Sequence, residues 1–291
     1  MNGDSLASAA RGEEPPIEIV LHVPKCAGST VEAHLLAHLG PAFWSAPKRT
    51  RRLPLELLGR KYAARPPVPP AEIHAVSGHF IGRSIEALFP GRRALRSVLL
   101  REPKALVLSW YNFRMMRYRA AGQASYPFGL HLRTLSPDPL CHFLLSHWLE
   151  MSWPQMALLS PAEKLKRLEA TFAAFDFVGD IADCDVMLAT ISGRLGVPET
   201  AARTNTGSGW QAVTGWEPLR LDALSDEDRA LLERRTELDA CLYARLVRRE
   251  PRAPRAEAAE RFLAAELRRP LAELRRRALR GRATTESTPP A

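Results

Sequence analysis

The sequence predicts an α/β protein with three layers, in which helices flank a central parallel sheet. Short runs that are apolar on both faces, as strands in the middle of a parallel sheet are, lie at residues 17–23, 73–80, 96–101 and 175–180. Stretches with the apolar spacing of helices alternate with these runs, which favours parallel units of strand, helix and strand. A chain of 291 residues, of which 46% are hydrophobic, can bury a complete core of this kind.

The composition divides the chain into one domain with two appendages. Residues 1–16 lack the apolar core of a signal peptide and predict a flexible arm, and residues 17–250 form the domain. Residues 251–291 hold ten Arg against five Glu, so this tail carries +5 of the formal net charge of +9. Apolar residues recur in the tail at helical intervals before a polar, Pro-rich end that is typical of disorder.

The most informative segment begins with the first apolar run. Pro24 ends this predicted strand, and Lys25 follows it with a full positive charge. The next residues are small enough for a tight turn that aims several backbone N–H groups at one anion, and they include Ala27, Gly28 and Ser29. A helix predicted at 29–39 adds the positive end of its dipole, so this junction predicts a phosphate site.

The position of the lysine separates this loop from that of nucleotide kinases and ATPases. Their motif, G-x-x-x-x-G-K-[ST], places the lysine at the helix start and a hydroxyl beside it for magnesium. Here Lys25 comes before Gly28, so this loop does not have the kinase and ATPase motif. The sequence has no metal-ligand cluster, and its four cysteines show no CxxC spacing; we expect free thiols and no metal cofactor.

A second candidate phosphate site follows the run at 96–101. Arg101 closes this predicted strand, and Pro103, a residue suited to a helix start, precedes a helix predicted at 104–118. Ser109 lies six residues beyond Pro103, which is roughly 9 Å along a helix. A guanidinium at the strand tip and a hydroxyl on the helix can therefore hold one phosphate together.

A third segment, the run at 73–80, contains Gly78 followed by His79, a histidine whose chemistry would allow it to act as a base. Imidazole has an unperturbed pKa near 6.5 and can take a proton from an alcohol near neutral pH, an effect on the order of 10²- to 10⁴-fold in rate. A lone histidine is more often a surface or core residue than a catalyst. The assignment of His79 therefore depends on the neighbouring motifs.

Together these segments resemble the sulfotransferases that use 3′-phosphoadenylyl sulfate (PAPS). PKCAGST, residues 24–30, is similar to their 5′-phosphosulfate loop, and LLREPKALVLSWYNF, residues 99–113, is similar to their 3′-phosphate motif. The pair Gly78-His79 stands where uronyl 2-O-sulfotransferases and their bacterial relatives have the catalytic base. The resemblance extends over about residues 17–247, although only these three motifs are specific.

The resemblance implies a P-loop-type fold and an enzyme that transfers the sulfuryl group of PAPS to a hydroxyl by in-line displacement. It implies His79 as the base and Lys25 as the residue that neutralises charge on the leaving 3′,5′-bisphosphate. The PAPS-binding residues that it implies are Pro24, Lys25, Cys26, Ala27, Gly28, Ser29, Thr30, Arg101, Ser109 and Asn205. The acceptor that it favours is a glycan or glycolipid, and a small-molecule alcohol stays open.

Some positions depart from the family pattern. Cys26 stands where Thr is common, and Ser29-Thr30 inverts the usual order, but both changes keep small side chains and a hydroxyl. Ala182 falls where many relatives carry Glu, which leaves the hydrogen bonding there open. The loop with Asn205 matches one that closes over the nucleotide in relatives, and a polar surface loop is the alternative.

The remaining segments concern the acceptor and packing. The resemblance implies that irregular insertions at 43–70 and 118–139 wall the acceptor site, and functional residues in general concentrate on loops. A helix predicted at 185–195 ends at Gly196. Ser225 and the acidic residues after it begin an amphipathic helical stretch that runs to Val247.

The lack of a long apolar run bears on the location of the protein, and the basic tail bears on its partners. Because no run of 18 apolar residues is present and animal Golgi relatives carry an anchor, we expect a bacterial cytoplasmic protein. The basic tail is suited to lie on the inner face of the membrane or to bind a protein partner, and packing on its own domain is the alternative. Nucleic acid is not an expected partner, since no recognition module accompanies the arginines.

Two other functions stay open at this point. One is a P-loop small-molecule kinase, which would need a magnesium-dependent ATP site. The other is a non-catalytic nucleotide-binding scaffold that docks through its basic tail.

Overall fold

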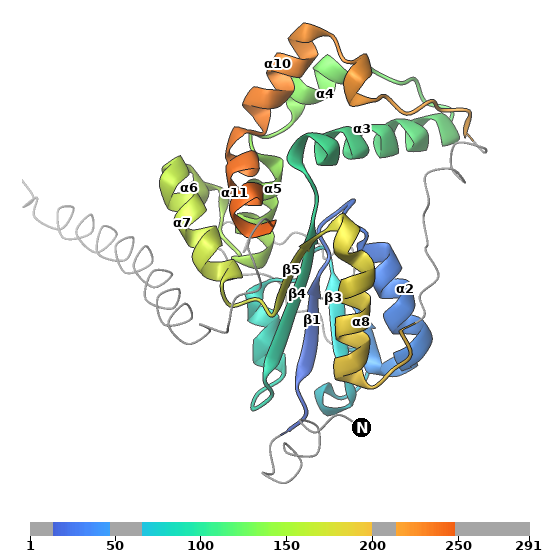
Figure 1. Cartoon of the computed structure of the whole chain (residues 1–291), viewed down its shortest axis with the longest axis vertical. Coiled ribbons are helices and arrows are strands. Elements are labelled where there is room, and N and C mark those ends of the chain that lie inside the picture. Colours follow the sequence, from blue (N-terminus) through green and yellow to red (C-terminus); the bar gives the residue numbers. More distant parts are fainter. Residues whose placement is uncertain (1–13, 47–65, 200–213, 248–291) are drawn as a thin grey trace, which may run out of the picture.

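The computed structural model describes residues 14–46, 66–199 and 214–247. Within them, five parallel strands form one sheet in the order β2-β3-β1-β4-β5 (Figure 1). The strands are β1 (Ile17–Leu21), β2 (Phe43–Ser45), β3 (Ala75–Gly78), β4 (Ala94–Leu100) and β5 (Phe177–Asp180). The predicted α/β class with a central parallel sheet is therefore confirmed.

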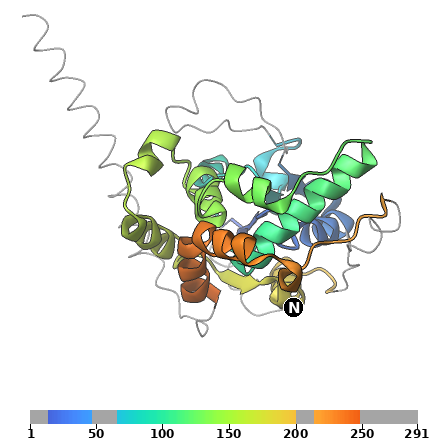
Figure 2. The same cartoon turned by 90° about the horizontal axis from the view of Figure 1, so that it is seen from above.

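Helices cover both faces of the sheet and the carboxyl ends of its strands (Figures 1 and 2). Those on one face are α2 (Gly28–Leu39) and α8 (Cys184–Leu195). Those that pack together on the other face are α5 (Pro139–Phe143), α7 (Pro161–Phe172) and α11 (Glu237–Val247), with α6 (Trp153–Ala157) before α7. Those beyond the carboxyl ends are α3 (Pro103–Ala120), α4 (Phe128–Thr134) and α10 (Asp226–Arg235).

β1 is the central strand, with partners on both sides. Its Ile19 pairs with Val76 of β3 and with Arg96 of β4. Every residue of β1 is buried, including Glu18. The helical layers on both faces explain why this strand lacks the alternation of apolar and polar residues that a half-exposed strand shows.

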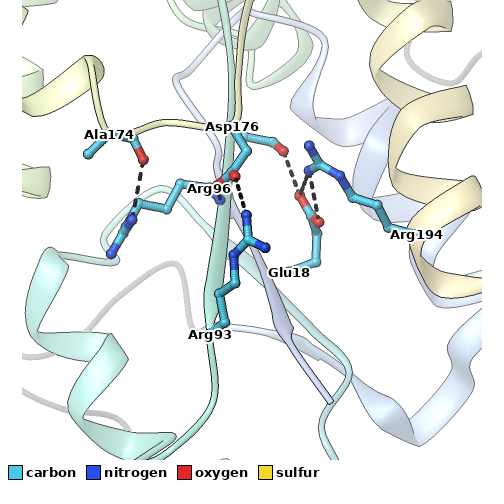
Figure 3. A network of polar contacts seen from close by, with 7 residues as sticks. Glu18, Arg93, Arg96, Ala174, Asp176 and Arg194 are labelled. Atoms are coloured by element: carbon cyan, nitrogen blue, oxygen red, sulfur yellow. Dashed lines mark hydrogen bonds and ion pairs between the residues drawn. The ribbon is translucent and has the colours of Figure 1, made fainter. Parts of the chain in front are cut away.

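The buried carboxylate of Glu18 has partners of its own (Figure 3). It accepts a hydrogen bond from Ser97 Oγ at 2.5 Å and bonds from Arg194 Nη1 at 3.3 and 3.2 Å. Burial raises the pKa of Glu18 to about 7, although the Arg194 charge and these hydrogen bonds act in the opposite direction. Because Arg194 belongs to α8, the ion pair ties that helix to the central strand.

Arg96 of β4 joins further segments to the sheet. Its Nε and Nη2 donate to the two carboxylate oxygens of Glu86 at 2.7 and 2.8 Å. Its backbone N–H donates to Asp176 Oδ2 at 2.9 Å, and its Nη1 donates to the main-chain oxygen of Ala174 at 3.3 Å (Figure 3). These bonds hold the loop before β5 against β4, which is a structural role.

Parts of the predicted insertions have regular structure. Phe43–Ser45 is the edge strand β2, in which Phe43 pairs with Ala75, so the prediction of an irregular segment from residue 43 is wrong. Within 118–139, α3 continues to Ala120 and α4 forms a further helix. A three-residue strand has little sequence signal of its own, and its partner β3 defines it.

The C-terminal helical stretch is divided in two. Ser225 is the N-cap of α10, as predicted, and its Oγ accepts from Asp228 N at 3.1 Å. α10 ends at Arg235 with Thr236 as its C-cap, and α11 begins at Glu237. Gly196 ends α8 in the left-handed conformation, with φ of 66°, as its position in the sequence predicts.

Two further predictions concern the ends of the chain and the cysteines. Arg92 donates to the main-chain oxygens of Pro15 and Pro16 at 2.7 and 3.0 Å, so the last residues of the predicted arm are held on the domain. The basic tail at 251–291 lies outside the described residues. All four cysteines are free thiols, as predicted. Of the helices described, none is both long and apolar enough to span a bilayer.

Candidate functional site

The three sequence motifs end on three neighbouring strands. Lys25 follows β1, His79 follows β3 and Arg101 follows β4, and these strands lie side by side in the order β3, β1, β4. Because the strands are parallel, their carboxyl ends share one edge of the sheet, over which α3 passes (Figure 1). After β1 the chain continues to β2, at one edge of the sheet, and after β4 it continues to β5, at the other edge. The edge between β1 and β4 is therefore a topological switch point, where open α/β sheets bind ligands.

The loop between β1 and α2 has an unusual backbone. Lys25 and Ala27 have φ values of 66° and 58°, in the left-handed region that residues with a Cβ rarely adopt. Such turns help to gather successive N–H groups into a concavity that suits an anion. α2 then begins at Gly28 without a side-chain cap and without an acidic residue in its first turn. Its N–H groups and its dipole consequently present a positive end toward the loop.

Gly28 is required by packing. A Cβ built on Gly28 would lie 2.0 Å from Cδ2 of the His22 ring. Of the three small residues expected to allow the tight turn, Ala27 takes a left-handed conformation, as does Lys25 before it. Gly28 instead leaves room for an imidazole against the start of α2.

Lys25 lies between the loop and α3. Its Nζ is 4.3 Å from the centroid of the Phe113 ring on α3, which is a cation–π contact. Burial lowers the pKa of Lys25, and the neighbouring charge of Arg101 lowers it further. Two cations so close together repel each other, and a bound anion would relieve that repulsion.

Arg101 has hydrogen-bonding capacity that the described chain does not use. Its Nη1 donates to the main-chain oxygen of Lys25 at 3.4 Å. Its Nε is buried and has no hydrogen-bond partner among the described residues. Buried N–H groups are nearly always paired, so an orphan of this kind calls for a ligand, an ion or water.

α3 brings Ser109 to the neighbourhood of the loop. The next residue, Trp110, donates from Nε1 to the main-chain oxygen of Pro24 at 3.2 Å. Ser109 itself is half-buried, and within the described chain no hydrogen bond joins it to Arg101. The shared phosphate grip of Arg101 and Ser109 therefore stays a prediction.

The N-terminus of α3 is already capped by a carboxylate. Glu102 accepts from Lys104 N at 3.2 Å and from Ala105 N at 2.7 Å. This helix end therefore does not offer a second set of N–H groups to an anion. A phosphate beside Arg101 would depend on side chains, in contrast to one at the start of α2.

His79 is half-buried beside the loop at the carboxyl end of β3. Its Nδ1–H donates to the main-chain oxygen of His22 at 2.7 Å. The rings of His79 and His22 lie 3.8 Å apart between centroids, tilted by 42°. Since a carbonyl oxygen only accepts, Nδ1 carries the proton, and Nε2 carries the lone pair in the neutral ring. This tautomer is the one that a base acting through Nε2 needs.

Sequence reasoning missed a carboxylate behind these histidines. Glu32 Oε1 accepts from His22 Nδ1 at 2.7 Å and from Ser77 Oγ at 3.1 Å. Burial raises the pKa of Glu32, but the hydrogen bond from His22, the charges of His22 and His79, and the Ser77 bond outweigh it and lower the pKa overall. The available signal is spacing: Glu32 is four residues after Gly28, on the same face of α2.

The other predicted residues of the loop have varied surroundings. Cys26 is buried in the core, and burial raises the pKa of its thiol, so its side chain is a packing group. Thr30 is buried as well, and its N–H already donates to Ala27 O at 2.9 Å. Ser29 is half-buried in the first turn of α2. Asn205 lies outside the described residues.

The position of Ala182 has local hydrogen bonds without a glutamate. Its N–H donates to Asp180 Oδ1 at 2.9 Å, and Asp180 N donates to Asp183 Oδ2 at 2.7 Å. Two aspartates therefore close this turn after β5. In the part of the chain that the structure describes, no group of three or more His, Cys, Asp and Glu residues is arranged to hold a metal ion.

Comparison with known proteins assigns no family. No family model matches the chain, and no curated protein is significantly similar to it. The family resemblance consequently depends on the three motifs and on the place that the fold gives them.

Proposed function

We propose that this protein is a PAPS-dependent O-sulfotransferase. The observation that carries the proposal is the buried Nε of Arg101, which lacks a partner in the described chain. Nη1 of the same guanidinium donates to the main-chain oxygen of Lys25, in the loop before the uncapped start of α2. Two cations, one orphan donor and a helix N-terminus form a site for a highly charged anion. A base candidate, His79, lies on the neighbouring strand, which suits a reaction at that anion.

In this proposal, the 5′-phosphosulfate lies at the start of α2. Lys25 and the first N–H groups of α2 neutralise charge that grows on the phosphate as the sulfuryl group leaves. Arg101, with Ser109, holds the 3′-phosphate. Preorganised charge of this kind contributes most to transfer reactions that resemble phosphoryl transfer.

His79 is the base. Its Nε2 takes the hydroxyl proton of the acceptor while the acceptor oxygen forms a bond to sulfur. The bond between sulfur and the bridging oxygen breaks, and the electron pair stays on the leaving 3′,5′-bisphosphate. The proton on His79 then passes to solvent.

The acceptor that we propose is a hydroxyl of a glycan or glycolipid. Phe80 follows His79 and is 39% exposed, so it offers an apolar face beside the base. Its ring is 5.0 Å from that of His147, which lies in a π-helical turn at Leu144–Trp148. Turns of this kind are rare and are frequent at functional sites.

The position of the Lys25 ammonium disfavours the kinase alternative. A kinase loop needs its lysine at the helix start, whereas here Ser29 follows Gly28 and the Lys25 ammonium contacts Phe113 of α3. The scaffold alternative depends on the basic tail, which lies outside the described residues, and no observation in the described part of the chain favours it.

The test is transfer of radiosulfate from labelled PAPS. The full chain is incubated with extract of the source organism and with purified glycans, and the labelled product is identified. We expect transfer that falls at least tenfold in both Lys25→Ala and His79→Ala, while His79→Ala keeps its affinity for adenosine 3′,5′-bisphosphate. Phosphoryl transfer from ATP with magnesium, or wild-type rates in either variant, would contradict the assignment.

A further inference from the structure

We propose that Glu32 is a positioning residue for His79, one that fixes the orientation of its ring and stabilises the imidazolium that forms when His79 takes a proton. This inference rests on the proposed function. Its basis is the chain of contacts from α2 through His22 to the end of β3.

Two successive hydrogen bonds connect Glu32 to the ring of His79. Glu32 holds the His22 side chain through the 2.7 Å bond to Nδ1, and the main-chain oxygen of His22 holds Nδ1 of His79 at the same distance. The ring of His22 fits against α2 only because Gly28 has no side chain. His79 is thereby oriented by a residue that is itself locked, which is how supporting groups make a reactive side chain rigid.

The charge of Glu32 also acts on the two histidines. The Glu32 side chain is 13% exposed, and its pKa is lowered by its neighbours despite burial, so it is ionised near neutral pH. The contributions to that shift include the charge of His79, which means that the carboxylate also favours a protonated His79. In the catalytic triads of hydrolases a carboxylate bonded directly to the imidazole base plays this part, whereas Glu32 is bonded to His22 and acts on His79 across it.

Other charged groups surround the pair. His22 faces His79 from the end of β1, and His147 lies beyond Phe80 on the far side. Lys25 and Arg101 follow the ends of the neighbouring strands β1 and β4. Glu32 is the carboxylate that the described contacts place next to these two imidazoles, and the charges of both act on it.

The experiment is a titration of the histidine ring signals by NMR on the full chain. The variants are Glu32→Gln, which keeps the shape and removes the charge, and Glu32→Asp, which keeps the charge; His79→Gln identifies the His79 signal. In Glu32→Gln we expect the His79 midpoint to move about one pH unit lower. Glu32→Asp should recover part of that shift.

Ser77→Ala is the matched control, because it removes the other hydrogen bond to Glu32 and leaves the charge. We expect the His79 midpoint in Ser77→Ala to stay close to that of the wild type. A purely structural Glu32 would instead make Glu32→Gln and Ser77→Ala alike, and a His79 midpoint that Glu32→Gln does not move would overturn the inference. A cooperative thermal unfolding transition in each variant is the control that the variant is folded under the conditions of the titration.

Turnover then separates this inference from the proposed function. With labelled PAPS, Glu32→Gln should lower kcat at least tenfold and move the pH profile with the His79 midpoint. If His79→Ala is inactive and Glu32→Gln has wild-type kcat and an unmoved profile, the inference fails and the proposed function stands. If His79→Ala is fully active, the base assignment itself fails.

Discussion

His79 and His22 are 57 residues apart in sequence, and the His79 ring donates a 2.7 Å hydrogen bond to the backbone of His22 and contacts its ring. The register of the sheet creates this relationship, because Leu21 of β1 pairs with Gly78 of β3 and the next residue on each strand is a histidine. Two imidazoles are thus placed beside the loop that holds Lys25. The site is a product of parallel pairing at one edge of the sheet.

The close packing of His22 on Gly28 leads to a stability prediction. In Gly28→Ala, the new Cβ meets the His22 ring, so either the ring moves or α2 shifts. We expect a loss of about 1 to 3 kcal/mol in the free energy of unfolding, measured by denaturant titration, together with weaker binding of adenosine 3′,5′-bisphosphate.

Gly193→Ala is the control for this substitution. Gly193 is also helical, on α8, but nothing lies within 4 Å of the Cβ that an alanine would add. Alanine favours a helix over glycine by about 0.5 to 1 kcal/mol, so this variant should be neutral or more stable. If both variants behave alike, the packing account of Gly28 is wrong.

A second prediction concerns pH and His131. Burial lowers the pKa of His131 to about 4, and the Arg114 charge acts in the same direction. Between that value and the ordinary 6.5, the unfolded chain binds the proton that the folded chain rejects, so this residue costs stability as pH falls. From pH 7.5 to pH 5 the loss attributable to His131 is about 1 to 2 kcal/mol.

Other buried groups change the free energy of unfolding with pH in the opposite direction. The contribution of His131 is therefore measured as the difference between the wild type and a variant that lacks this histidine. Burial raises the pKa of Glu18 and of Asp239 to about 7, and each therefore gains stability for the fold as pH falls through the same range. The free energy of unfolding is measured for the wild type and for His131→Phe at both pH values. Subtracting one protein from the other cancels the contribution of Glu18 and Asp239, which both proteins share. If the difference in free energy of unfolding between the two proteins is the same at both pH values, His131 does not titrate as described.

The cysteines give a third prediction. Cys241 is exposed, whereas Cys26, Cys141 and Cys184 are buried, and burial raises the pKa of Cys26 and Cys141. Because the thiolate is the reactive form, a thiol reagent should modify one cysteine in the native protein and four in denaturant. Mass spectrometry of the modified protein should locate the label on Cys241. Rapid native labelling of Cys26 would mean that the loop opens readily.

Much of the fold follows from local patterns in the sequence. The buried strands β1 and β4, the start of α3 at Pro103 and the end of α8 at Gly196 all have signals within a few residues. The strand β2 and the division at Thr236 have none, because they depend on contacts made at a distance. Asp239 illustrates this: its carboxylate accepts from Leu140 N and Cys141 N, about a hundred residues away in sequence.

The site was predicted unevenly for a related reason. Lys25, His79 and Arg101 could be found because each follows an apolar run at a strand end, and the parallel sheet brings such ends together. Glu32 was missed, because its spacing from Gly28 is a weak signal and a glutamate on a helix is ordinarily a solvated surface residue. Only the pairing of β1 with β3 places His22 and Ser77 where they can bond to it.

The central claim is that the site has separate places for two phosphates, and calorimetry tests it most directly. Adenosine 3′,5′-bisphosphate and AMP differ only in the 3′-phosphate, which Arg101 is proposed to hold. We predict that the wild type binds the bisphosphate much more tightly than AMP, and that Arg101→Ala weakens the bisphosphate far more than AMP. Equal losses for the two ligands in Arg101→Ala, or equal affinities in the wild type, would contradict the account.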